Sequence, residues 1–226
     1  MIANPLMETV EHDGVTGKLE ALDETKARLD ERARSNPESA VSLRYDRAFV
    51  AWRISRVIND RRDEKKRHAA LLEEAAEYLE AVLEDDPDHV ESMVLLAAVL
   101  SDQAGRSMFK RMTLGRRAYN LSARALELAP DNPRAAVQRG KIILYVPALM
   151  GGGPTNAIKL LERARTAFAK EDDSWPNWGQ VDAHGWYGRA LAQDGRIEEA
   201  RAVYQEALVI EPQASWIRDE LLPALD

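Results

Sequence analysis

The chain has 226 residues, 45% of them hydrophobic and 31% charged, which is the balance of a globular protein rather than a disordered one. A formal net charge of -7 argues against general nucleic-acid binding, because phosphate backbones are bound mainly by excess Lys and Arg. The absence of cysteine excludes disulfides, thiol catalysis and cysteine-ligated metals.

The N-terminal residues show no sign of a signal peptide, since MIANPLMETVEHDG has neither a basic segment nor an apolar one. We therefore expect a flexible N-terminus over residues 1–15 and a cytoplasmic protein, or a periplasmic one if a signal peptide has been removed. The longest apolar run, residues 93–100, is too short to span a bilayer, so no membrane span is predicted.

From residue 16 onward, apolar residues recur at spacings of three and four with no period of two, which predicts an all-helical chain. An unpaired helix is expected over about 16–34. Prolines then separate four helix pairs, predicted over roughly 39–84, 89–128, 133–169 and 180–210. A short helix around 215–222 should cap the last pair through Trp216 and Leu221.

An internal repeat supports these pairs. A small residue recurs in the second helix of each pair, with another apolar residue seven positions later, two helical turns on along the same face. These positions are Ala75, Ala118, Ala157 and Ala200, followed by Val82, Ala125, Ala164 and Ala207. In the last unit Gly188 stands where two helices should cross, and Gly140 and Ala97 take the same place in the preceding units.

The last unit, AHGWYGRALAQDGRIEEARAVYQEALVIEP, resembles the tetratricopeptide repeat (TPR), a helix–turn–helix of typically about 34 residues. The resemblance predicts an all-α, right-handed α-solenoid of about four TPR-like pairs, with the unpaired N-terminal helix and the C-terminal capping helix, as a single domain over 16–226. The expanded repeats, with PALMGGGP and WPNWGQVDAHGWYGRAL, resemble a long-repeat bacterial branch similar to the T-component proteins of TRAP transporters.

The three glycines at 151–153 raise the question of a phosphate-binding loop. Such a loop needs a preceding strand and a Lys-Ser/Thr after the last glycine. Here a helix precedes them and Pro154 and Thr155 follow, so we predict a turn, with Pro154 as the first residue of the next helix.

Catalytic and metal-binding patterns are missing from the sequence. The four histidines (His12, His68, His89 and His184) have no ligand spacing, and no Ser or Thr is grouped with a His and an orienting residue. We predict a non-enzymatic protein with no catalytic, cofactor-binding or metal-binding residues. His184 is expected in the core or at its rim.

The first helices of the pairs should line a concave groove. Its predicted partner-binding residues are Glu91, Val94, Ala98, Ser101, Arg134, Val137, Lys141, Leu144, Asp182, Arg189 and Gln193. Three cations among them indicate a peptide or an anionic ligand. Trp175 and Trp178 lie in a loop, where they either plug a gap or form a contact surface. The Lys/Asn pattern of chaperone-binding TPR domains is not reproduced.

Turns inside the pairs are basic (61–67 and 106–117), whereas those between pairs are acidic (84–88, 131 and 171–173). We hypothesise that these edges steer a partner or a second copy of the chain.

The sequence leaves two functions open. The chain is a scaffold that binds a protein or peptide in its groove, or, as the resemblance to T-components implies, a periplasmic accessory of small-molecule transport. A closed apolar cavity lined by Val137, Leu144, Met150 and Trp186 would favour the second. A small-molecule ligand and a homo-oligomer are kept as alternatives.

Overall fold

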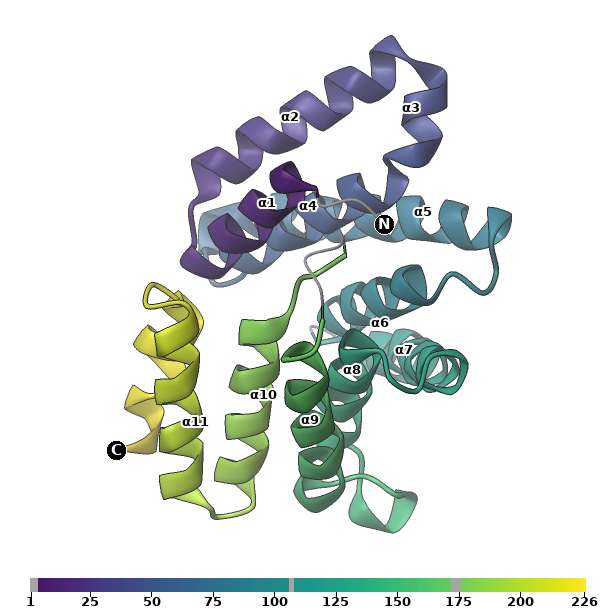
Figure 1. The fold of residues 1–226 in the computed structure, drawn as a ribbon. Helices are drawn as coiled ribbons and strands as arrows, with labels where there is room; N and C mark the ends of the chain where they lie inside the picture. The colour runs from purple at the N-terminus through teal and green to yellow at the C-terminus, as the bar shows by residue number, and fades with distance from the viewer. Residues whose placement is uncertain (1–3, 106–107, 172–175) are drawn as a thin grey trace. The chain divides into compact units, whose positions relative to one another are not determined.

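A computed structural model describes residues 4–105, 108–171 and 176–226, and these contain helices and connecting turns but no strand (Figure 1). None of the described helices is both long and apolar enough to cross a bilayer. The helices form two compact units, an N-terminal unit over Asn4–Leu128 and a C-terminal unit over Ala129–Asp226. The single domain over 16–226 stays a prediction, and each unit is described by itself.

The N-terminal unit contains two of the predicted helix pairs. Its helices are α1 (Pro5–Thr16), α2 (Leu19–Ser35), α3 (Pro37–Ser42), α4 (Arg44–Val57), α5 (Lys65–Asp85), α6 (Val90–Ala104) and α7 (Met108–Leu128), with a 3-10 turn, η1 (Arg62–Glu64), before α5. Helix α4 pairs with α5, α6 pairs with α7, and α5 packs on α6. The pairs predicted over 39–84 and 89–128 are therefore confirmed, except that residues 37–42 form a separate short helix.

The start of the chain contains a helix that the sequence did not predict. Residues 5–16 form α1, which packs on α2 and α4. The flexibility expected over residues 1–15 stays a prediction. Met7 and Val10 are buried, and Gly17 ends the helix with a positive φ of 78°. Among the described side chains of α1, Met7 and Val10 are the fully buried apolar ones, too short a series for hydrophobic periodicity to reveal the helix.

The C-terminal unit contains the other two pairs. Its elements are α8 (Pro133–Leu144), η2 (Ala148–Met150), α9 (Pro154–Phe168), α10 (Gln180–Gln193), α11 (Ile197–Ile210), η3 (Trp216–Leu221) and η4 (Pro223–Leu225). Helix α8 pairs with α9, α10 pairs with α11, α9 packs on α10, and α8 also contacts α10. The predicted pairs over 133–169 and 180–210 are confirmed.

The crossing points follow the predicted repeat register. A Cβ atom added at Gly188 would overlap the ring of Tyr204, and one at Gly140 would lie 2.7 Å from Cγ of Leu161. Ala97, at the same place in the N-terminal unit, is fully buried. Small residues at these positions let paired helices approach closely.

The predicted C-terminal cap is present as η3. Trp216 lies against Gly185 and the ring of Trp186, with the two indole centroids 5.3 Å apart, and Ile217 and Leu221 are buried. This element covers the apolar face that the last helix pair would otherwise leave open.

The glycines at 151–153 form the predicted turn. The Gly153 N–H donates to the Ile143 carbonyl at 2.8 Å, and a Cβ at Gly152 would overlap the Val146 carbonyl. Pro154 is the first residue of α9, as predicted.

Candidate partner-binding surface

The predicted groove residues of the N-terminal unit lie on α6, and two of the four are buried. Val94 and Ala98 are buried, and the Ser101 hydroxyl donates to the Ala97 carbonyl at 2.6 Å. Glu91 and Ser101 are half-buried. Helix α6 therefore offers little apolar surface to a partner at these positions.

A second group of polar and aromatic side chains joins α1, α4 and α6. The Arg53 guanidinium, 2% exposed, forms an ion pair with Glu11 of α1 and lies 4.7 Å from the Trp52 ring centroid. The Trp52 indole N–H donates to Asp102 of α6 at 2.9 Å. These residues occupy no repeated position, so the repeat analysis did not identify them.

In the C-terminal unit, two cations lie against one indole ring. Lys141 Nζ of α8 is 5.1 Å from the Trp186 ring centroid, and Arg189 Cζ of α10 is 5.5 Å from it. A cation at this range is attracted to the electron-rich face of an indole. We call Lys141, Trp186 and Arg189 the indole–cation cluster.

The central residue of the cluster, Trp186, is packed within the C-terminal unit. Trp186 is 9% exposed and packs on Trp216 of the cap, whereas Arg189 is half-buried. Gln193, one turn further along α10, is exposed. Among the predicted groove residues of α10, side-chain exposure therefore increases from Asp182, which is buried, to Gln193, which is exposed.

Arg134, the third predicted groove cation, holds the unit together. Its guanidinium makes two hydrogen bonds with the Glu171 carboxylate, at 2.8 and 2.6 Å, and one of 3.5 Å to the Trp178 carbonyl. It also lies 5.8 Å from the Phe168 ring centroid and is only 5% exposed. Arg134 therefore ties the chain that follows α9 to the start of α8.

Several other predicted residues are packed inside the C-terminal unit. Val137, Leu144 and Asp182 are buried. Trp178 is 5% exposed and Trp175 lies outside the described residues, so the contact loop stays a prediction. The groove as a whole stays a prediction.

His184 is a buried histidine of α10. Its Nδ1 atom lies 2.9 Å from the Gln180 carbonyl, and burial lowers its pKa below the usual 6.5 because the charged imidazolium is disfavoured away from water. This position agrees with the core or rim location predicted from the sequence.

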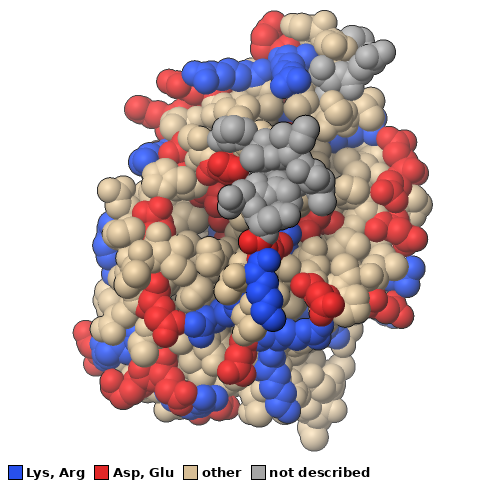
Figure 2. Space-filling model, viewed as in Figure 1, with Lys and Arg blue, Asp and Glu red and all other residues tan. Residues whose placement is uncertain are grey.

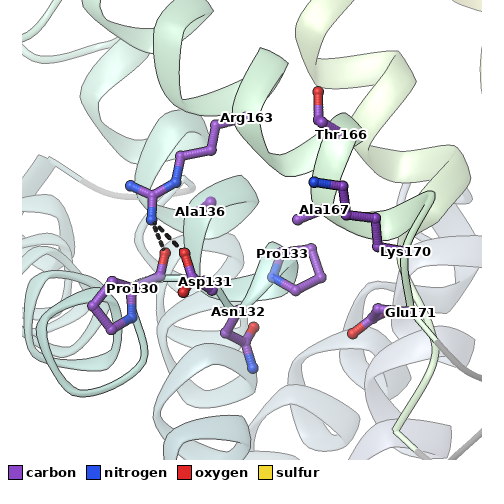
Figure 3. A pocket seen from close by; sticks show the side chains of 10 residues that line it. All are labelled: Pro130, Asp131, Asn132, Pro133, Ala136, Arg163, Thr166, Ala167, Lys170 and Glu171. Carbon is purple, nitrogen blue, oxygen red and sulfur yellow. Dashed lines mark hydrogen bonds and ion pairs between the residues drawn. The ribbon is translucent and has the colours of Figure 1, made fainter.

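A pocket of about 670 Å³ lies between the segment before α8 and the end of α9 (Figure 3). Its lining carries both signs of charge, with Arg163 bonded to Asp131 and to the Pro130 carbonyl. The Asn132 side chain caps α8 by accepting from the Ala135 N–H at 2.9 Å. None of the residues proposed for a closed apolar cavity lines this pocket, and Met150 is 72% exposed.

Charges of both signs are interspersed on the face shown in Figure 2. In the N-terminal unit the turn before α5 exposes Arg61 and Arg62, and the turn before α6 exposes Asp86 and Asp88. The side chains of residues 106–111 and residues 172–173, which the edge hypothesis also uses, lie outside the described part. The edge hypothesis stays a prediction.

Comparison with known proteins supports the repeat. Residues 181–214 match the tetratricopeptide repeat family. No curated protein matches the chain in sequence.

Solved structures with a similar fold include TTC0263, a thermophilic TPR protein of Thermus thermophilus, with a TM-score of 0.62, 17% identity, and coverage of 96% of this chain and 98% of that one. The HusA haemophore from Porphyromonas gingivalis is similar with a TM-score of 0.56, 24% identity, and coverage of 80% and 93%. At these identities the likeness shows the fold. The chain is a TPR-type helical-repeat protein in architecture, a fold that generally serves as a non-enzymatic scaffold.

Proposed function

We propose that the chain is a non-enzymatic scaffold that binds an acidic segment of a partner protein through the indole–cation cluster of its C-terminal unit. The observation that carries this proposal is the placement of Lys141 and Arg189 against the same indole, on adjacent first helices of two pairs. First helices form the usual binding face of such repeats.

The chemistry of the cluster suits a carboxylate-bearing peptide. A guanidinium can bind a carboxylate through two parallel hydrogen bonds, and the packed Trp186 ring beside Arg189 restricts that side chain before a peptide binds. Trp and Arg are also the residues that most often dominate binding energy at interfaces. Arg189 and Gln193 are the accessible groups of α10 that a peptide would meet first.

The test begins with selection from a displayed library of random 16-residue peptides. We expect enrichment of Asp and Glu, and fluorescence anisotropy of the selected peptides should show at least about tenfold weaker binding to Arg189→Glu, because an attractive charge becomes a repulsive one. Lys159→Glu, an exposed lysine of α9, is the matched control and should bind like the wild type.

Lys141 needs a milder change because it is only 9% exposed. Lys141→Met keeps the length of the side chain and removes its charge, and we expect about threefold to tenfold weaker binding with an unchanged circular dichroism spectrum. Selected peptides without acidic residues, or equal affinity for wild type and Arg189→Glu, would refute the proposal.

The transport alternative has a different requirement. It needs a closed apolar cavity, and the exposure of Met150 removes one of the side chains that would line it. The similarity to TRAP T-components, the periplasmic location, the small-molecule ligand and the homo-oligomer therefore stay predictions, and the peptide-binding proposal does not depend on them.

A further inference from the structure

The turn between α8 and α9 exposes three large apolar side chains. Tyr145 is 57% exposed, Leu149 102% and Met150 72%. Residues 142–158 contain no Asp, Glu, Lys or Arg, although 31% of the chain is charged. We call residues 145–150 the apolar tip; it belongs to the projecting turn that joins α8 to α9 in Figure 1.

The tip has a defined backbone. The N–H groups of Met150 and Gly152 both donate to the Pro147 carbonyl, at 2.8 and 3.2 Å, and the Gly151 N–H donates to the Ala148 carbonyl at 3.0 Å. The Asn156 side chain donates to the Gly152 carbonyl at 3.2 Å. Leu149 and Met150 therefore belong to a turn in which several backbone N–H and carbonyl groups are hydrogen-bonded.

We propose that the apolar tip inserts into the surface of a lipid bilayer, as an interaction separate from peptide binding by the indole–cation cluster. A lipid environment favours backbone polar groups that bond internally, and the N–H groups of Met150, Gly151 and Gly152 do so. Tyr145, at the base of the tip, is of the residue type that prefers the boundary between lipid and water.

Other occupants fit the tip less well. A protein interface carries about one hydrogen bond per 100–200 Å² and a polar rim, whereas residues 146–150 have no polar side chain. A second copy of the chain would need roughly 800 Å² on each partner, far more than three side chains offer. A lipid surface needs only apolar area without charge.

The expected binding is weak and reversible. Removing one such side chain from water shifts an equilibrium by about twentyfold, so three give a partition coefficient on the order of 10⁴ M⁻¹, similar to a single acyl chain. The net charge of -7 and the uncharged tip predict no preference for anionic over zwitterionic lipid.

The absence of cysteine allows one unique label. Leu149→Cys carrying an environment-sensitive dye should show a blue shift and increased emission with phosphatidylcholine vesicles, half-complete near about 0.1 mM accessible lipid. Val209→Cys, at an 83% exposed position on α11, is the matched control and should not respond. About 5 mM lipid lies well above the half-point expected for a single acyl chain. No response of the Leu149→Cys label up to that concentration would overturn the proposal, and an apolar pocket on a partner protein would become the next candidate.

A label-free experiment tests the same surface. In vesicle flotation, the double variant Leu149→Asp/Met150→Asp should bind at least about 100-fold more weakly than the wild type, whereas Val209→Asp should bind normally. All of these positions are exposed, so folding should be retained, and circular dichroism checks it. Equal flotation of the double variant and the wild type would overturn the proposal.

Discussion

Both units are built from helix pairs, but different contacts hold the helices together in each unit. The crossings of the C-terminal unit depend on glycines, with Gly188 against Tyr204 and Gly140 against Leu161. In the N-terminal unit the crossing residue is Ala97, and α1 and α2 are joined to α4 and α5 by charged side chains. Glycine at a repeated spacing is visible in a sequence, whereas a single ion pair between distant helices is not.

The largest expected effect is at a glycine crossing. Gly188→Val should destabilise the C-terminal unit by about 3 kcal/mol, because the new side chain would overlap the buried Tyr204 ring. Urea unfolding followed by circular dichroism measures the change. The control is Gly115→Ala on α7 of the N-terminal unit, where no atom lies within 4 Å of the added Cβ, and we expect stabilisation by about 0.5–1 kcal/mol. Equal losses for the two variants would contradict the proposed difference between the units.

An intermediate effect is expected where charge holds the N-terminal unit together. Arg53→Met should cost about 2 kcal/mol, because the ion pair with Glu11 is lost in a largely buried setting while the 18% exposure of Glu11 allows partial hydration. Hydrogen exchange should then rise in residues 5–16, since α1 loses its ion pair with Arg53 of α4. Arg61→Met, at an exposed position in the turn before α5, should leave exchange in α1 unchanged. Unaltered protection of α1 in Arg53→Met would show that Met7 and Val10 suffice to hold it.

The smallest effect is the pH dependence of stability. Burial lowers the pKa of His184, so the unfolded chain takes up a proton near pH 6.5 while the folded chain takes it up at lower pH. The stabilisation is fully present above pH 6.5 and is lost as pH falls through the folded-state pKa. His184→Gln should therefore flatten the stability curve of the C-terminal unit between about pH 7 and pH 5, measured by urea unfolding at each pH. An unchanged slope would contradict the assignment to His184.

The N-terminal unit should respond at lower pH. Burial raises the pKa of Asp30, but hydrogen bonds from Lys26 and Arg47 outweigh burial and lower it below 3.8. Its contribution is present above that value and is lost as pH falls through the lowered pKa. Asp30→Asn should remove this acid-dependent loss, and hydrogen exchange between about pH 5 and pH 2 would locate the change in α2 and α4.

The candidate site was only partly accessible from the sequence. Lys141 and Arg189 were predicted as groove cations from their positions relative to the small crossing residues, and both lie against Trp186. Arg134 was predicted by the same rule, yet it pairs with Glu171, in the segment that follows the end of α9. A position rule identifies the helix face on which a side chain lies, but not whether another part of the chain has already paired with it.

The sequence by itself determined the helix pairs, their register, the turn at 151–153 and the C-terminal cap. These depend on spacings of three, four and seven residues and on the backbone limits of proline and glycine, which are local properties. Only the tertiary structure decided that α1 is a packed helix, that Arg134 is engaged with Glu171, and that Leu149 and Met150 face water. Exposure and ion pairing depend on residues brought together from distant parts of the chain, and no local pattern records them.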